Sequence, residues 1–403
     1  MELFNRNYLF KLTMVSIFLF PLVSENAVPF IGLTMGLYFI GYLSIQKDAL
    51  NRFIRARKQG RLGYTMSFFL FILVALITVI YSQDRTQTLW GVFVYLSAFA
   101  LFIVLKYEVN RPNHMVPLMR AYFISTFVVG FYHFGQIVYD EIVRNIPFDP
   151  VTNYSFMENA PSLAYFMLIP LFPALVLYIY KDKKNESRFY LLVVTVALIT
   201  IFMSGSRIAV VGVFIGLVLL SLLYSVKFLI AFIPAGIFAV LIPIFTQRHD
   251  QHFLLSAERG RFGFYLDLLK ENAGSLLLGK GFFTFDQTFN QFMEGKSSLL
   301  NLDLVNKAYN MPVQIVLEIG ILGLLAGALM VFFKMRALRL YTKSTKGREN
   351  LRVMYVGITI SMIVLLFVGA MDSYLMDPKI VYSMAILMGI MHGDAKYRGI
   401  HNI

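Results

Sequence analysis

The residues of this chain best suited to chemistry are arginines that stand where apolar segments meet. The stretch ITIFMSGSRIAVVGVF (199–214) places Arg207 directly after Ser-Gly-Ser and before a second apolar run. A guanidinium can bind phosphate oxygens through two parallel hydrogen bonds, and the first amides of a helix also favour negative charge. An arginine at this position could instead only extend to the membrane interface. The pattern therefore predicts either an anion site or an interfacial anchor.

Two further arginines, Arg259 and Arg261, occur in AERGRFGFY and precede a segment of helical periodicity. The apolar residues at that spacing in RFGFYLDLLKE are Phe262, Tyr265, Leu266 and Leu269. This pattern is typical of an amphipathic helix that lies against a membrane face, which would hold both arginines at headgroup depth. The alternative is a solvated basic face. Arginines that converge there would suit a lipid pyrophosphate.

Other candidate groups are isolated. Glu318, in MPVQIVLEIGILGLL, is a carboxylate inside an apolar run, where it would face a cavity or pair with a structural arginine. His249 and His252 in HDQH have a metal-like spacing but lack a third strong ligand, and the chain has no cysteine. No Asp-x-Asp and no glycine-rich phosphate loop occurs. We therefore expect no metal and no cofactor.

The elements that must position these residues are apolar helices. Of the 403 residues 58% are hydrophobic and 15% are charged, against about 25% charged in soluble domains. Runs near the roughly 20 residues needed to cross a bilayer occur throughout the chain. We place them at 8–24, 27–45, 64–82, 88–105, 121–138, 161–180, 190–205, 208–225, 228–246, 311–333, 353–371 and 379–393. The sequence predicts an all-α polytopic membrane protein with about 12 transmembrane helices in a single integral membrane domain, 1–403.

The charge distribution predicts the orientation. With the N-terminus inside, the cytoplasmic segments hold 25 of the 36 Lys and Arg residues but only 7 of the 23 Asp and Glu residues. This bias follows the positive-inside rule and places both termini in the cytoplasm. The net charge of +13 is then a topology signal, so nucleic acid is not an expected partner. Two long connections, 139–160 and 247–310, fall on the outer side, and loops of such length tend to be functional.

Four blocks together resemble the superfamily of O-antigen polymerases (Wzy-type) and O-antigen ligases. They are FMENAPSLAYFM (156–167), SGSRIAVVGVFIG (204–216), RFGFYLDLL with GSLLLGKGFFTF (274–285), and KAYNMPVQIVLEIGILGLL (307–325). The similarity covers about residues 155–330. The blocks stand in the family's order, on a frame of about twelve spans with one long outer loop.

The resemblance implies a glycosyltransferase in the bacterial inner membrane whose active site faces the periplasm. Its donor would be a glycan on undecaprenyl pyrophosphate, and no metal would be required. The family's pyrophosphate-binding arginines correspond to Arg207 and Arg261, with Arg259 as a further contact. Partners expected from the family are a chain-length regulator and a flippase.

At one position the chain departs from the ligase branch. That branch carries His-Asn where this sequence has Tyr309-Asn310, and a tyrosine with a pKa near 10 is a poor base at neutral pH. Tyr309 could still orient an acceptor, with Asn310 beside it. Carboxylates that could act as the base are Glu318, Glu158 and Asp303, and Asn159 adjoins Glu158 as a substrate contact.

The sequence therefore favours a polymerase that transfers a glycan to the non-reducing end of another lipid-linked repeat, with inversion. One alternative is a ligase that transfers the glycan to lipid A core. An alternative of another class is a flippase for lipid-linked oligosaccharide, which the spans fit but the long outer loop and the lack of an internal repeat do not.

Overall fold

The structure, a computed structural model, consists of helices joined by turns. It describes residues 5–58, 63–108, 112–146, 153–180, 184–223, 225–237, 260–293, 308, 310–344 and 349–397. Over these residues there is no β-strand. The all-helical fold class expected from the sequence is therefore confirmed for the described part of the chain.

The helices before the long 247–310 connection are α1 (Arg6–Leu19), η1 (Glu25–Ala27), α2 (Val28–Ile45), α3 (Lys47–Lys58), α4 (Tyr64–Thr78), α5 (Arg85–Glu108), α6 (Pro112–Ile142), α7 (Ala160–Tyr180), α8 (Lys184–Met203), α9 (Arg207–Leu223) and η2 (Val226–Ala231). Those within and after it are α11 (Gly260–Glu271), η4 (Ala273–Ser275), α12 (Phe285–Met293), α13 (Met311–Ser344), α14 (Glu349–Met371) and α15 (Pro378–Tyr397).

Six of the described helices are long and apolar enough to cross a membrane. They are Glu25–Ile45, Arg85–Tyr107, His114–Ile142, Ala160–Tyr180, Met311–Lys343 and Arg352–Met371. Shorter apolar helices cover Tyr64–Thr78, Ser187–Met203, Arg207–Leu223 and Val226–Ile237. Each predicted apolar run overlaps a described helix, although the run 228–246 is described only to residue 237. By helix length and composition, the chain is a multi-pass membrane protein.

Short polar side chains set the starts of several helices. The Asn5 carboxamide accepts hydrogen bonds from the amides of Asn7 and Tyr8 and so begins α1. Asn159 accepts one from the Ser162 amide at the start of α7, and Asn310 accepts one from the Val313 amide at the start of α13. These bonds satisfy amides that have no partner within their own helix.

The core is centred on α7, which is buried along most of its length and packs mainly against α8 and α14. Gly357 permits the close approach of α14, because a Cβ there would lie 2.6 Å from Pro173 Cα. Around this centre α5 packs against α15 and α2, and α13 packs against α4. A second, smaller core, the outer core, lies apart from it. Its buried residues are Leu268, Phe285, Phe289, Phe292, Ala308 and Leu317.

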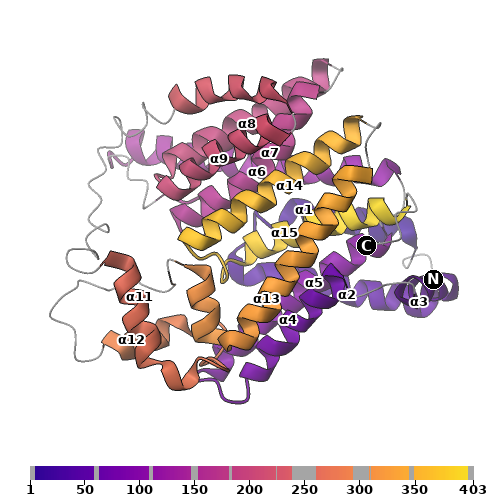
Figure 1. Ribbon diagram of the computed structural model, residues 1–403. Coiled ribbons are helices and arrows are strands. Elements are labelled where there is room, and N and C mark those ends of the chain that lie inside the picture. The colour runs from indigo at the N-terminus through magenta and orange to yellow at the C-terminus, as the bar shows by residue number, and fades with distance from the viewer. Residues whose placement is uncertain are drawn as a thin grey trace.

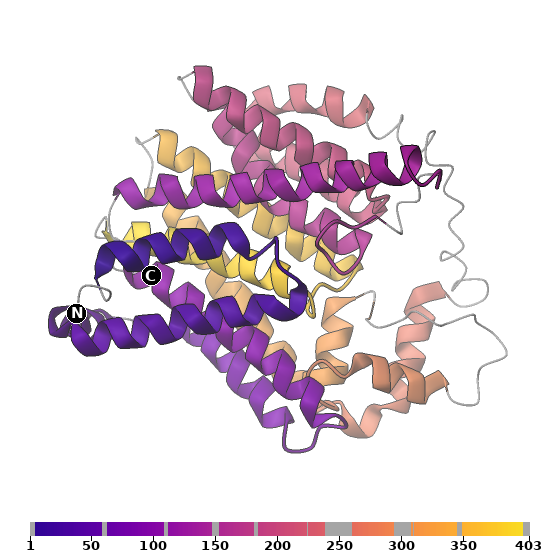
Figure 2. The same ribbon diagram turned by 180° about the vertical axis from the view of Figure 1, so that it is seen from behind.

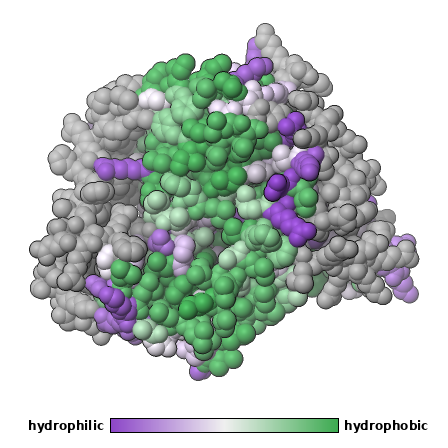
Figure 3. Space-filling view, viewed as in Figure 1, coloured by the Kyte–Doolittle hydropathy of each residue, from purple (hydrophilic) through white to green (hydrophobic). Residues whose placement is uncertain are grey.

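The ends of the bundle differ. The two opposite ribbon views show α3 and the last turns of α15 at one end, and α11 and α12 at the other (Figures 1 and 2). The space-filling view shows the face of the molecule that is in front in Figure 1. This face carries a broad hydrophobic surface, with a recess near its middle where hydrophilic side chains lie (Figure 3). A hydrophobic surface of this breadth is what lipid chains would cover.

The outer core is joined to α13 through a break in that helix at Gly320, whose φ of 80° and ψ of −176° are not helical. The break exposes backbone groups, and the turn before α12 binds them. The amides of Lys280 and Gly281 donate to the carbonyls of Leu317 and Glu318, both at 2.9 Å. In return the Ile321 amide donates to the Leu276 carbonyl at 2.8 Å. The kink in α13 is thus explained by the turn before α12, which binds the backbone groups at Gly320.

Gly320→Ala should lower the free energy of unfolding by about 1–3 kcal/mol or more, since this backbone conformation is nearly restricted to glycine. A Cβ there would also lie 2.3 Å from the Leu277 carbonyl oxygen. Thermal unfolding in detergent measures the change. Gly327→Ala in the same helix is the matched control, because its Cβ would meet nothing closer than 3.6 Å. Equal melting temperatures for the two variants would contradict the docked-turn interpretation.

Candidate functional site

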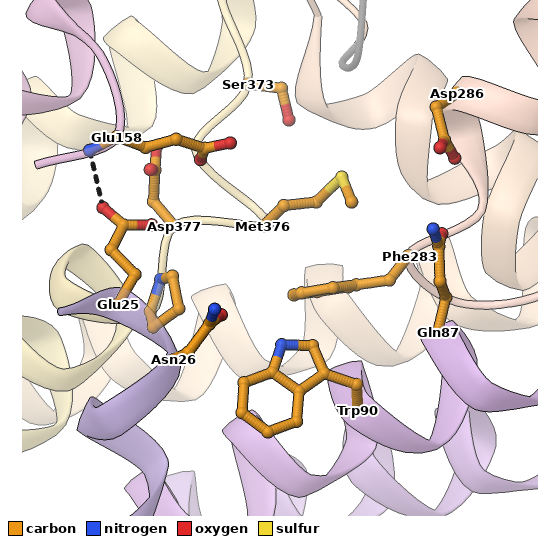
Figure 4. Close-up of a pocket in the computed structure, with 11 residues that line it drawn as sticks. Glu25, Asn26, Gln87, Trp90, Glu158, Phe283, Asp286, Ser373, Met376 and Asp377 are labelled. Atoms are coloured by element: carbon orange, nitrogen blue, oxygen red, sulfur yellow. Dashed lines mark hydrogen bonds between the residues drawn. The ribbon is translucent and has the colours of Figure 1, made fainter.

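A cavity of about 450 Å³ lies where several helix connections meet (Figure 4). Its described lining residues are Glu25, Asn26, Gln87, Trp90, Glu158, Phe283, Asp286, Ser373, Met376, Asp377 and Pro378. They belong to the α1–α2 connection, the start of α5, the segment before α7, the start of α12 and the α14–α15 connection. The sequence assigns all of these segments to the same side of the membrane.

One wall of the cavity is acidic, and it is called here the acidic wall: Glu25, Glu158 and Asp377. Each offers a carboxylate oxygen, and the three oxygens lie within 4.8 Å of one another. The backbone amide of Glu158 donates a hydrogen bond to Glu25 Oε1 at 2.9 Å. Carboxylates this close repel one another unless positive charge or donors lie nearby.

Lys379 supplies that positive charge without lining the cavity. Its side chain is only 1% exposed, and its ammonium group interacts with the Glu25 and Asp377 carboxylates. The same group donates hydrogen bonds to the carbonyls of Pro21, at 3.1 Å, and Phe156. A buried ammonium is tolerated only when paired and hydrogen-bonded, so Lys379 fixes these segments to one another.

The α14–α15 connection is held from α5 and α7 as well. The Tyr95 hydroxyl donates to the Leu375 carbonyl at 2.9 Å, and the Ser162 hydroxyl lies 2.9 Å from Asp377 Oδ2. The Tyr165 hydroxyl donates to Asp372 Oδ2. Four of the lining residues, those from Ser373 to Pro378, are therefore carried by a segment that buried bonds hold in place.

The opposite wall is aromatic, with one carboxylate. Trp90 and Gln87 come from the first turns of α5, while Phe283 and Asp286 come from the start of α12. Figure 4 shows Asp286, Gln87 and Phe283 across the cavity from the acidic wall, with Trp90 below. Phe283 has a φ of 65°, which is strained for a bulky residue. Such strain persists only where the surroundings impose it, and functional sites concentrate it.

Glu318 is the group that holds Phe283 in this conformation. Its Oε2 accepts the Phe283 amide at 3.0 Å, and its Oε1 accepts Gln314 Nε2 at 2.9 Å. Glu318 is 1% exposed and is not among the described residues that line the cavity. The sequence predicts a catalytic role for this carboxylate, and in the structure it is bonded to the backbone of the aromatic wall.

Two charged groups outside the spanning helices fasten the start of α12. The pKa of Asp84 is lowered chiefly because its carboxylate accepts the Gln87 amide, and it also accepts Gln287 Nε2 at 3.0 Å. Lys280 Nζ donates to Gln291 Oε1 of α12 at 3.4 Å, and burial lowers the pKa of this lysine. The aromatic wall is therefore attached to the α4–α5 connection as well as to α13.

Arg207 begins α9, and its side chain is exposed. It is not among the described lining residues of the cavity. The preceding residue, Ser206, interacts through its side chain with Tyr165, whose hydroxyl is bound to Asp372 at the edge of the α14–α15 connection. The Ser-Gly-Ser-Arg turn is thus joined through Tyr165 to Asp372, the residue before Ser373 of the cavity lining.

The other sequence-predicted residues have separate positions. Glu158 lines the cavity. Asn159 caps α7, and Asn310 caps α13 while its Nδ2 donates to the Ala370 carbonyl at 2.8 Å. Arg261 lies in α11, the helix expected there, but its side chain is outside the described part. Arg259, Tyr309, Asp303, His249 and His252 lie outside the described residues.

Sequence reasoning missed most of the cavity. Glu25, Trp90, Asp286 and Asp377 received no role, although two signals were present. Trp90 is the only tryptophan of the chain. Asp372, Asp377 and Lys379 are concentrated in one short connection between two apolar runs, where charge is otherwise scarce. Charged residues at such positions are costly and tend to be functional.

The acidic wall is also the group of described residues that could hold a metal ion, since carboxylate oxygens suit Mg²⁺ or Ca²⁺. The Lys379 ammonium group interacts electrostatically with two of its three carboxylates, Glu25 and Asp377. The single positive charge of Lys379 thus offsets part of the negative charge of the acidic wall.

Comparison of the chain with known protein families finds no match, and comparison with curated proteins finds none either.

Glu318→Ala should lower the free energy of unfolding by about 1–3 kcal/mol, because the buried Phe283 amide loses its acceptor. Glu318→Gln keeps an acceptor oxygen and should cost less. Thermal unfolding of both variants in detergent measures the difference. Unchanged stability in Glu318→Ala would mean that this carboxylate does not support the aromatic wall.

Asp84→Ala should lower the melting temperature at pH 7, and the difference from wild type should shrink as the pH falls below about 4. The folded-state pKa of Asp84 is lowered from its ordinary value of 3.8, so its contribution is complete above that value. The contribution disappears as the pH falls through the lowered pKa. Asp84→Asn, which cannot ionise, serves as the control, and a gap that widens in acid would contradict the assignment.

Proposed function

We propose that this protein is a polysaccharide polymerase that transfers a glycan from a polyprenyl pyrophosphate donor to the non-reducing end of another lipid-linked repeat. The observation that supports this most strongly is the cavity. It lies where helix connections meet, and it combines carboxylates on both sides with aromatic rings. This is a surface suited to carbohydrate.

The lining chemistry fits a sugar better than other small ligands. Sugar hydroxyls donate hydrogen bonds to carboxylate oxygens, of which Glu25, Glu158, Asp286 and Asp377 offer several. The apolar C–H face of a pyranose ring packs against an aromatic side chain, which Trp90 offers. Phe283 also lines the cavity but is only 5% exposed. A volume of about 450 Å³ lies in the range of small-molecule sites.

The proposed topology has about twelve spans, both termini in the cytoplasm and the cavity on the periplasmic side of a bacterial inner membrane. The excess of Lys and Arg in the segments opposite the cavity supports this orientation. A polyprenyl pyrophosphate carries its glycan at the membrane surface while its chain stays in lipid. The cavity would then meet the glycan, and the hydrophobic surface in Figure 3 would meet the polyprenyl chain.

The proposed reaction is a displacement at the anomeric carbon of the donor. A hydroxyl of the acceptor sugar forms the new C–O bond while the bond to the pyrophosphate breaks, and the pyrophosphate leaves with the electron pair. A carboxylate that lines the cavity, Glu158 or Asp286, would take the proton of the hydroxyl. Arg207, with Arg261, would neutralise the leaving pyrophosphate. Attack opposite the leaving group inverts the anomeric centre.

In purified protein supplied with a polyprenyl-pyrophosphate-linked repeat and no added metal, wild type should form a ladder of glycan lengths on gels. Arg207→Ala and Arg261→Ala should each reduce the rate by 100-fold or more, on the order of 2.7 kcal/mol, comparable to the loss of one oxyanion donor. Arg339→Ala is the control. Arg339 is exposed like Arg207, but it lies near the C-terminal end of α13, whereas the segment that docks onto the cavity wall contacts the first turns of this helix.

Other products would identify other functions. Transfer of the glycan to lipid A core without a ladder would make the protein a ligase despite Tyr309. Movement of the lipid-linked repeat across liposome membranes without any transfer would make it a flippase. If both arginine variants still form the ladder, the protein is a polymerase, but these arginines do not bind the leaving pyrophosphate.

A further inference from the structure

The charges that line the cavity all have one sign. Its charged side chains among the described residues are Glu25, Glu158, Asp286 and Asp377, and no lysine or arginine is among them. Lys379 lies behind the acidic wall, 1% exposed, with its hydrogen bonds committed to backbone carbonyls. A ligand inside the cavity therefore meets carboxylates and no exposed positive partner from these residues.

The carboxylates also face one another across the space. Three of them form the acidic wall, and Asp286 stands on the opposite side (Figure 4). Asp286 Oδ1 is buried and has no hydrogen-bond partner among the described residues. No described donor compensates the negative charge at this oxygen. An anionic group placed in between would be repelled from both sides.

The remaining lining surface is apolar and aromatic. Trp90, Phe283 and Met376 lie around the centre of the cavity in Figure 4. Phe283 is 5% exposed and packs close to α5, where Gly91 leaves it room: a Cβ there would lie 2.7 Å from its ring. Trp90 is therefore the more accessible of the two rings. This surface can bind the face of a neutral ring but gives an anionic substituent no compensation.

We propose that the cavity binds a sugar that carries no negative charge and excludes uronic acids and other anionic sugars. Identification of the ligand as a glycan rests on the function proposed above. Repulsion from the carboxylates would be strong because a partly enclosed site screens charge less than water does. Like-charge juxtaposition is an effective way to reject a wrong ligand. The pyrophosphate of the donor would then be bound outside the cavity.

Trp90 makes a direct binding measurement possible, because it is the only tryptophan and it lines the cavity. The probes are a neutral hexose trisaccharide and the matched trisaccharide whose terminal hexose is oxidised to its uronic acid. We expect the neutral probe to change Trp90 fluorescence with saturation. The acidic probe should bind at least about 10-fold more weakly at low salt, a difference of about 1.4 kcal/mol.

Variants identify the source of the discrimination. Asp286→Asn and Glu158→Gln remove charge from opposite sides of the cavity and should each bring the two affinities closer together. Asp140→Asn is the control, since this carboxylate is paired with Arg144 at 3.3 Å and is not a lining residue. It should leave the ratio unchanged.

Equal affinity for the two probes, or tighter binding of the acidic one, would overturn the proposal. A fluorescence response to neither probe would also overturn it. The outcome is separable from that of the ladder assay. Charge-selective binding with no polymer from any lipid-linked repeat would leave the cavity assignment intact and refute the polymerase. Efficient polymerisation of acidic and neutral repeats alike would support the polymerase and refute the charge selectivity of the cavity.

Discussion

The candidate site depends on one buried ammonium group, that of Lys379. A charge at this depth is stable only if oxygen atoms surround it, and the fold brings carbonyls of Pro21 and Phe156 together with the carboxylates of Glu25 and Asp377. These residues come from segments that are distant in sequence. The requirement to satisfy one lysine therefore fixes where the α1–α2 connection, the segment before α7 and the start of α15 meet. The acidic wall is the surface of that junction.

The helices could be predicted from the sequence and the cavity could not, for physical reasons. Apolar runs such as 161–180 are defined by their own composition, since a bilayer-spanning helix needs only length and hydrophobicity. The helix at 260–271 was likewise visible in its periodicity. The cavity, by contrast, takes one to four residues from each of several connections, so no local pattern marks it. Glu25 reads as an ordinary break between two spans, and only the three-dimensional fold places it beside Asp377.

Glu318 illustrates the same limit from the other side. A carboxylate inside an apolar run is conspicuous in the sequence, and chemistry is a reasonable expectation for it. What the sequence does not contain is the partner, the Phe283 amide, which lies 35 residues earlier in a turn of positive φ. The residue that stands out is thus bonded to the aromatic wall without being one of the described lining residues, whereas Asp286, which lines the cavity, looks unremarkable in FTFDQTF. A polar residue inside an apolar run is easy to notice because its burial is costly. That cost does not show whether the residue lies near a ligand.

The docked turn at Gly320 gives the two walls different mechanical attachments. The acidic wall is fixed to the centre of the bundle through Lys379. The aromatic wall is bonded to α13, a 34-residue helix that extends towards the opposite end, and to the α4–α5 connection beside it. The two walls of the cavity therefore belong to different sets of helices: one is bonded to the buried start of α15, and the other to α13 and the α4–α5 connection.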